Sequence, residues 1–256
     1  MRNLEEWDGA VLAELDSVWA KRVIFHETCG STNDEARRLA KAGAENWRVV
    51  LTEKQTAGRG RRGQDWHCPP GAGIAITVIL RPDFPKVFWS RLALATGLAV
   101  AEALDHFGVA AEVKWPNDVW VDRKKICGVL VEAEDDFVLI GIGLNVNVRE
   151  FPSELTDPAT SLFLEKGEMV GREEVLLMIL RRLERRVAQV DRDFPALLSA
   201  LRARCALTGH EIVLDLPTGK IAGTMRGIGE GGELILETEK GEMRTILQAE
   251  RIRLKI

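Results

Sequence analysis

The sequence lacks several features that mark whole classes of protein. It has no basic surplus, since 35 lysines and arginines stand against 39 acidic residues, with a formal net charge of −4 and a pI near 5.7. Nucleic-acid-binding proteins usually carry an overall basic face, so this balance argues against that class. No apolar run approaches the length that spans a bilayer, and the N-terminus lacks the pattern of a secretory signal. We expect a cytoplasmic protein with no membrane partner.

Cysteine and histidine are also scarce. The four cysteines are far apart in the sequence, they form no C-x-x-C pair, and no histidine cluster accompanies them. Zinc sites and disulfide frameworks are therefore not expected. The four histidines show no arrangement typical of a catalytic triad, so nothing supports nucleophilic catalysis by serine, cysteine or histidine.

By contrast, residues 54–66 concentrate glycine and arginine. The six positions from Gly58 to Gly63 hold three glycines and three arginines, and Trp66 follows. We expect the glycines to turn the backbone through positive φ and to bring its N–H groups close to a ligand. Arginine forks suit carboxylate and phosphate oxygens, and the tryptophan offers a face on which a base can stack. This segment, the arginine loop, is predicted to bind an anionic ligand with a ring; the alternative is an exposed basic turn.

The spacing of these glycines also satisfies G-x-G-x-x-G, which would indicate a dinucleotide-binding crevice. That interpretation requires a helix that begins at the third glycine. Pro69, Pro70 and Gly71 follow closely and would break such a helix. The sequence therefore disfavours a Rossmann site.

Hydrophobic spacing predicts the order of helices and strands. Helices are expected at residues 4–20, 32–42, 89–107 and 176–190, and from 195 to about 206. Strands are expected at 23–25, 47–52 and 73–80, then a strand from 113 that ends in a bend set by Pro116, a hairpin of 119–121 and 126–132 with its turn at 122–125, and a strand at 137–144. Thr32 and Glu35 stand in capping-box register. The arginines of the fourth helix are interpreted as a solvated face; they are Arg181, Arg182, Arg185 and Arg186.

The character of the chain changes near residue 206. Short β-like segments separated by glycines then continue to the end of the sequence. This pattern is typical of a compact β-barrel or sandwich. We expect a main domain at residues 1–206, with 1–22 as a helical extension, and a small β-domain at 207–256.

Two further polar groups are candidates for chemistry. Asp118 follows a bend set by Pro116, and it is either a magnesium ligand or an Asx turn that starts a hairpin. Lys125 ends a charged turn, where it could face developing phosphate charge or remain in water. Gly141 and Gly143 lie inside an apolar strand, which indicates close approach of another element or of a ligand.

Taken together, these motifs resemble biotin protein ligases in identity, order and spacing. They are the arginine loop with Trp66, Lys-Trp-Pro-Asn-Asp at 114–118, Lys-Ile-Cys-Gly at 125–128 and Gly-Ile-Gly-Leu-Asn-Val-Asn at 141–147, with Ser-Thr-Asn at 31–33 and Gln55. The resemblance covers about residues 23–256.

The resemblance implies an α+β fold. Its catalytic domain would be class II synthetase-like, with a mixed, mainly antiparallel sheet and flanking helices, followed by a small C-terminal SH3-like β-barrel. It also implies a two-step reaction in which biotin and Mg-ATP give biotinyl-5′-AMP and pyrophosphate, and a lysine of a biotin carboxyl carrier protein, an acetyl-CoA carboxylase subunit, then takes the biotin. Only about 22 residues precede the first matching strand, which resembles the ligase-only type without a DNA-binding domain. An exposed sheet edge could support a homodimer.

The resemblance also assigns roles to individual residues. The biotin-binding set is Ser31, Thr32, Asn33, Gln55, Gly58, Arg59, Gly60, Lys125, Gly128, Gly141 and Gly143. The nucleotide-binding set is Arg61, Arg62, Trp66, Asn117, Lys125 and Asn145, with Asp118 as the Mg²⁺ ligand. The catalytic residues implied are Lys125, Arg61 and Arg59. The alternatives are a lipoate or octanoate ligase or transferase of the same fold, a non-catalytic biotin-binding sensor, and a nucleic-acid-binding module.

Overall fold

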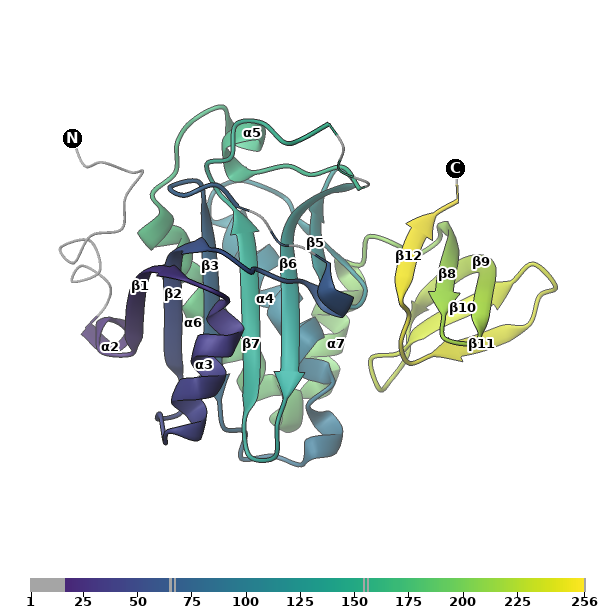
Figure 1. Ribbon diagram of the computed structural model, residues 1–256. Coiled ribbons are helices and arrows are strands. Elements are labelled where there is room, and N and C mark those ends of the chain that lie inside the picture. Colours follow the sequence, from purple (N-terminus) through teal and green to yellow (C-terminus); the bar gives the residue numbers. More distant parts are fainter. Residues whose placement is uncertain (1–16, 65, 67, 154, 156, 256) are drawn as a thin grey trace.

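The computed structural model describes residues 17–64, 66, 68–153, 155 and 157–255, which form two β-sheets with helices packed on the larger one (Figure 1). Most of the helix expected at residues 4–20 lies outside the described residues, and only its end is described, as α2 (Ser17–Ala20). Within the described chain, no helix is both long and apolar enough to cross a membrane.

The larger sheet has seven strands in the order β1-β2-β3-β7-β6-β5-β4. They are β1 (Val23–Cys29), β2 (Arg48–Gln55), β3 (Gly73–Leu80), β4 (Glu112–Lys114), β5 (Asp118–Val121), β6 (Lys124–Ala133) and β7 (Val138–Asn145). β1 and β2 pair in parallel, and every other neighbouring pair is antiparallel. The expected mixed, mainly antiparallel sheet with flanking helices is confirmed.

Helices cover both faces of this sheet because alternate strand residues are apolar on both sides. Val49 and Leu51 of β2 belong to the main core, whereas Val50 packs with Ala36 and Ala40 of α3 in a second cluster. Figure 1 shows α3 on one face and α4 and α6 on the other. The helices are α3 (Thr32–Lys41), α4 (Arg91–Asp105), α5 (Leu162–Lys166), α6 (Arg172–Arg192) and α7 (Phe194–Ala203), with short 3-10 turns η1 (Arg61–Gly63) and η2 (Lys86–Phe88).

Two local predictions about these helices are wrong. The capping box does not form, because Thr32 is already the first helical residue and the carboxylate of Glu35 pairs with Arg38 at 2.6 Å. The arginine face of α6 is not wholly solvated either. Arg186 is only 7% exposed, and its guanidinium pairs with Glu102 of α4. A buried partner on a neighbouring helix cannot be seen in the spacing of one helix.

The smaller sheet follows α7 and is antiparallel throughout, in the order β11-β10-β9-β8-β12. Its strands are β8 (Glu211–Leu216), β9 (Gly219–Ile228), β10 (Leu234–Thr238), β11 (Met243–Ile246) and β12 (Arg251–Leu254). It is tied to the larger sheet next to β4, since Trp115 Nε1 donates to Gly232 O at 2.9 Å. Apolar side chains of both sheets share one buried cluster, so the division at residue 206 stays a prediction.

Candidate active site

The hairpin of β5 and β6 places a lysine beside a carboxylate. The chain leaves β4 through the cis peptide bond before Pro116 and enters β5 at Asp118. Asp122 and Arg123, with φ of 47° and 63°, make the turn alone. Lys125 therefore lies inside β6 rather than in the turn, which corrects the expectation from the sequence. Its Nζ lies 2.8 Å from Asp118 Oδ1, and both side chains are partly buried.

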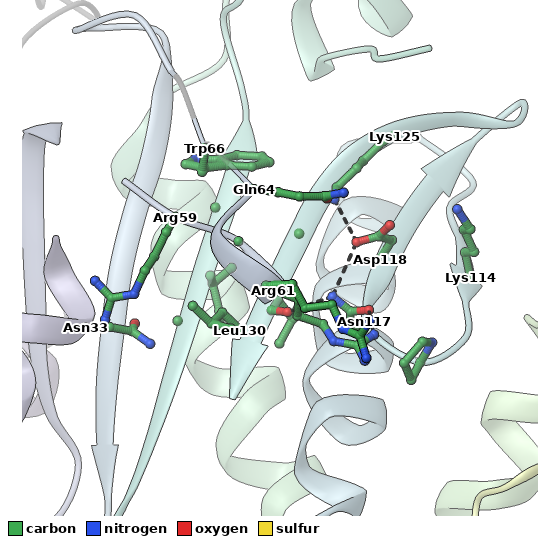
Figure 2. Close-up of a pocket in the computed structure, with 18 of the residues that line it drawn as sticks. Asn33, Arg59, Arg61, Gln64, Trp66, Lys114, Asn117, Asp118, Lys125 and Leu130 are labelled. Atoms are coloured by element: carbon green, nitrogen blue, oxygen red, sulfur yellow. Dashed lines mark hydrogen bonds and ion pairs between the residues drawn. The ribbon is translucent and has the colours of Figure 1, made fainter. Parts of the chain in front are cut away.

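A pocket opens around this pair, between the arginine loop, β6, β7 and the start of β12 (Figure 2). Most residues that the resemblance selects line it: Ser31, Thr32, Asn33, Gln55, Arg59, Gly60, Arg61, Arg62, Trp66, Asn117, Asp118, Lys125, Gly128, Gly141 and Gly143. Gly58 and Asn145 do not line it. The Nδ2 of Asn145 donates to Thr160 O at 3.1 Å, and Thr160 N in turn donates to Lys125 O at 2.9 Å.

One end of the pocket presents amide and hydroxyl groups. The backbone N–H of Thr32, at the start of α3, donates to Gln55 Oε1 at 2.9 Å. Beneath them, Thr77 Oγ1 lies 2.9 Å from Thr32 Oγ1 and 2.5 Å from Asn33 Oδ1. Asn33 Nδ2 donates to Glu132 Oε2 at 2.6 Å. Because these groups hold one another, they are pre-oriented for a small polar ligand rather than free to rotate.

Glycines on β6 and β7 make room for side chains of the pocket. A Cβ on Gly143 would lie 2.6 Å from Trp66 Nε1, and a Cβ on Gly141 would overlap Asn33 Oδ1. On the neighbouring strand β6, a Cβ on Gly128 would lie 3.5 Å from Trp66 Cζ3. The indole thus lies over a glycine-lined part of the sheet, as the glycine-in-strand rule predicts. Trp66 Nε1 is buried without a hydrogen-bond partner in the described chain.

Substitution of Gly143 tests whether Trp66 must occupy this position. In Gly143→Ala the new methyl overlaps the indole, and the ring has to leave the glycine surface. If the ring stacks on a base, we expect the KM for ATP to rise about 5- to 100-fold, because such stacking is worth about 1–3 kcal/mol. Gly30→Ala is the matched control, since a Cβ there meets nothing within 4 Å. An unchanged KM for ATP in Gly143→Ala would argue against stacking on Trp66.

The two ends of the arginine loop, which lines the pocket, are held together by backbone contacts. Trp66 N donates to Gly58 O at 3.0 Å, and a Cβ on Gly58 would lie 2.5 Å from Trp66 O. Positive φ was expected at all three glycines, but within the described loop only Arg62 at 58° and Gly63 at 71° have it. Gly58 is thus required for its lack of a side chain rather than for its φ.

Each arginine of the loop has its own partner. Arg59 forms a bidentate pair with Asp34 of α3, with both N–O distances at 2.6 Å, and this contact lowers the pKa of Asp34. Arg61 donates to Asn117 Oδ1 at 3.0 Å and to Ala249 O at 3.1 Å. Burial lowers the pKa of Arg61. Arg62 pairs with Glu250 at 2.5 Å. The loop is therefore anchored to α3 on one side and to the smaller sheet on the other.

The Arg59–Asp34 pair predicts that loss of either side chain speeds release of a bound intermediate modestly and to a similar extent. If Arg59 only anchors the loop, Arg59→Ala and Asp34→Ala should each speed release of a bound intermediate by at most about fivefold, because partly exposed ion pairs contribute about 0.2–1 kcal/mol. The double variant should then add little, which a double-mutant cycle of release rates measures. A large loss of chemical rate in Arg59→Ala alone would instead favour the catalytic role implied by the resemblance.

Several lining residues were not predicted from the sequence. They are Gln64, Lys114, Asp157 and the segment 249–252. Lys114 offers a signal in retrospect, as a lysine between apolar residues just before Trp115. Residues 249–252 offer none, because their position depends on how the two sheets pack.

The oxygen ligands suited to Mg²⁺ are few. Asp118 and Asp157 both line the pocket, and no group of three potential metal-binding side chains occurs among the described residues. Mg²⁺ often binds through one or two carboxylates together with substrate phosphates. The donor set therefore fits a magnesium ion that arrives with a nucleotide, and does not fit a site built by protein side chains alone.

These features define a class of enzyme. The pocket has a polar end for a small ligand, an aromatic face, and cationic groups around a lysine–aspartate pair. Such an arrangement suits the activation of a carboxylic acid by a nucleotide, where positioning and charge stabilisation carry the chemistry.

Comparison with known proteins agrees with that class. Residues 27–147 match the Biotin/lipoate A/B protein ligase family. The chain is 36% identical to the biotin–[acetyl-CoA-carboxylase] ligase of Mycobacterium tuberculosis, over 86% of this chain and 85% of that protein. It is also 36% identical to the bifunctional ligase/repressor BirA of Bacillus subtilis, over 88% of this chain and 72% of that protein. The Aquifex aeolicus biotin protein ligase, solved with biotin and ATP, superposes with a TM-score of 0.82 at 33% identity, covering 92% of this chain and all of that one.

The chain belongs to the Biotin/lipoate A/B protein ligase family, and its relatives and structural neighbours include proteins named as biotin ligases.

Proposed function

We propose that this protein is a biotin protein ligase that works in two steps. The carboxylate of biotin attacks the α-phosphorus of ATP, which forms biotinyl-5′-AMP and releases pyrophosphate. The amine of a carrier lysine then attacks the acyl carbon, the bond to the AMP oxygen breaks, and the lysine nitrogen loses a proton as the amide forms. The observation that carries the proposal is the Lys125–Asp118 pair in a pocket covered by the arginine loop.

The polar end of the pocket suits the ring of biotin. Thr32, Asn33 and Gln55 offer hydroxyl and amide groups that match a cyclic urea, which both donates and accepts hydrogen bonds. Asn33 and Thr32 are held by Thr77, so the donors need little reorganisation on binding. The carboxylate end of such a ligand would point toward Lys125 and Arg61.

Lys125 is the residue best placed to stabilise developing charge. Its ammonium lies 2.8 Å from Asp118, and Asp118 Oδ1 also lies 3.5 Å from Asn117 Nδ2. Asp118 thereby holds the ammonium in one orientation, where it can neutralise charge on the reacting phosphoryl and acyl oxygens. No covalent enzyme intermediate is needed. Asn145 does not lie on the pocket surface. Its side chain donates a hydrogen bond to Thr160 O, and Thr160 N donates to Lys125 O, so Asn145 acts on Lys125 through the backbone of Thr160.

The arginine loop would protect the reactive anhydride. Because the loop spans from α3 to the smaller sheet, its closure excludes water from the pocket. Mg²⁺, held by Asp118 with Asp157, would neutralise phosphate charge when it is bound with ATP.

Other parts of this proposal concern partners and location. The acceptor is a biotin carboxyl carrier domain, in keeping with the names of the Mycobacterium and Paracoccus relatives. We propose no DNA binding, since the net charge is −4. The edge strand β1 could pair two copies into a homodimer. Four free cysteines suit a reducing cytoplasm.

Mass spectrometry of an acceptor tests the proposal. The protein is incubated with Mg-ATP and a biotin carrier domain, with biotin in one tube and lipoate in another. We expect a biotin-sized mass gain on one carrier lysine in the first tube only. A gain with lipoate alone would keep the fold and overturn the substrate. No gain in either tube would leave a binding protein.

A further inference from the structure

A buried ion pair lies outside the pocket, between α6 and the end of β2. Arg172 is the first residue of α6 and is only 2% exposed. Its Nη1 and Nη2 lie 3.1 and 3.2 Å from the two carboxylate oxygens of Glu53 in β2. Neither residue lines the pocket, and the proposed reaction uses neither of them.

The pair holds the stretch of chain that leads from the arginine loop back into the sheet. This stretch, residues 68–73, is called the return segment and ends at the first residue of β3. Gly71 N donates a hydrogen bond to Glu53 Oε1, and Arg172 Nη1 donates to Gly73 O at 3.1 Å. The carboxylate and the guanidinium thus each hold one end of the last turn before β3.

Further hydrogen bonds close a ring around the return segment. Ala72 O accepts from Val146 N at 3.1 Å and from Asn147 N at 2.7 Å, just after the end of β7. The side chain of Asn147 in turn donates to Val170 O and accepts from Val170 N, both at 3.0 Å. Val170 lies two residues before Arg172, so the contacts lead back to α6. Because each group in the ring holds the next, the return segment is fixed in one arrangement.

The return segment begins beside Trp66, whose ring depends on this support. On its other side, Trp66 is held by the arginine loop, since its N–H donates to Gly58 O at 3.0 Å. Its ring lies against Gly143, and Lys125 Nζ lies 5.8 Å from the ring centroid. Figure 2 shows the ring between Arg59 and Lys125, above the pocket. A shift of the return segment would therefore move the aromatic face of the site.

We propose that Arg172, through Glu53 and the return segment, is a positioning residue that fixes Trp66 for the base of the nucleotide. A buried ion pair adds little net stability compared with apolar side chains, but the planar fork of arginine fixes its acceptors in one geometry. A lysine ammonium is a point charge without such a fork, so it would hold the same groups less exactly. This inference rests on the proposed function.

The first test compares ATP with biotin in Arg172→Lys. We expect the KM for ATP to rise about 5- to 100-fold, the range that corresponds to loss of stacking on one base. The Kd for biotin should change less than about threefold, because Thr32 and Gln55 hold each other at the other end of the pocket. In a Trp66→Ala background, Arg172→Lys should raise the KM for ATP by less than about twofold, since both changes remove the same contact.

A second buried ion pair on α6 supplies a matched control. Arg186 is 7% exposed and pairs with Glu102 of α4, which lies outside both the pocket and the return segment. The variants are Arg172→Met with Glu53→Gln, and Arg186→Met with Glu102→Gln. Loss of both charges of a buried pair is often tolerated, so both double variants should fold. We expect the KM for ATP to rise in the first and to stay unchanged in the second.

Three results would overturn the inference. They are an equal rise of the KM for ATP in the two double variants, an unchanged KM in folded Arg172→Lys, and a full effect of Arg172→Lys in the Trp66→Ala background. Amide hydrogen exchange of the ligand-free protein gives a measurement that does not depend on catalysis. The peptide that contains Gly71 should exchange faster in Arg172→Lys than in wild type, and equal exchange would also contradict the inference. A wild-type protein that makes no biotinyl-AMP would instead overturn the proposed function.

Discussion

Replacement of Lys125 by alanine should lower the rate of biotinyl-AMP formation by about 10²- to 10³-fold, while the Kd for biotin changes less than about threefold. Loss of one preorganised charge-stabilising group commonly costs that much in rate. Lys125 contacts Asp118 at 2.8 Å and lies beyond the polar end of the pocket, where Thr32 and Gln55 lie. Its charge therefore acts on the reacting phosphorus more than on the biotin ring. Single-turnover rates beside equilibrium binding of biotin separate the two effects.

Two controls sharpen this result. Lys124→Ala, on the exposed neighbour in β6, should leave the rate unchanged. Asp118→Asn keeps the ammonium but removes both its partner and the proposed ligand of Mg²⁺, so its rate should also fall below that of wild type. The account is wrong if Lys125→Ala loses biotin affinity as strongly as it loses rate, because the lysine would then bind ground-state biotin rather than stabilise the reacting centre.

Replacement of Arg61 by glycine should speed the release of biotinyl-AMP by about tenfold to a hundredfold. Arg61 joins the arginine loop to Asn117 and to Ala249 O, in the connection between β11 and β12 of the smaller sheet. Removal of the guanidinium breaks both contacts, and hydrogen bonds to charged groups contribute about 1.5–3 kcal/mol, which is about one to two powers of ten in a rate of release. The released intermediate should then acylate exposed lysines of any protein in the solution. Dissociation of a purified complex, followed by filter binding, measures the rate.

A second variant separates the loss of the Arg61 guanidinium from the effect of introducing a glycine. Arg123→Gly introduces glycine into an exposed turn whose φ of 63° glycine adopts readily, and it lies outside the pocket. We expect no change in release there. If Arg61→Gly and wild type release biotinyl-AMP at the same rate, the loop does not retain the intermediate.

The residues that could be predicted from the sequence are those whose chemistry is local. The arginine loop, Trp66 and the Lys-Trp-Pro-Asn-Asp bend are continuous in the chain, and the structure brings them to one pocket. The individual strands and helices followed from hydrophobic spacing, whereas their arrangement in a mixed sheet followed from the resemblance. The turn was expected to include Lys124 and Lys125, but β6 already begins at Lys124. The turn is shorter because Asp122 and Arg123 adopt positive φ, which non-glycine residues seldom show.

What the sequence could not reveal depends on distant contacts. Asp34 engages the fork of Arg59 from α3, so an arginine expected to face ligand anions is held as an anchor. Glu250 and Arg251 reach the pocket only because the smaller sheet packs beside β4.

Native mass spectrometry of the protein after incubation with biotin and Mg-ATP, without any acceptor, tests the central claim most directly. The account predicts one biotinyl-5′-AMP retained per protein chain and one pyrophosphate released into solution. A complex that contains biotin and intact ATP, with no pyrophosphate in solution, would contradict it.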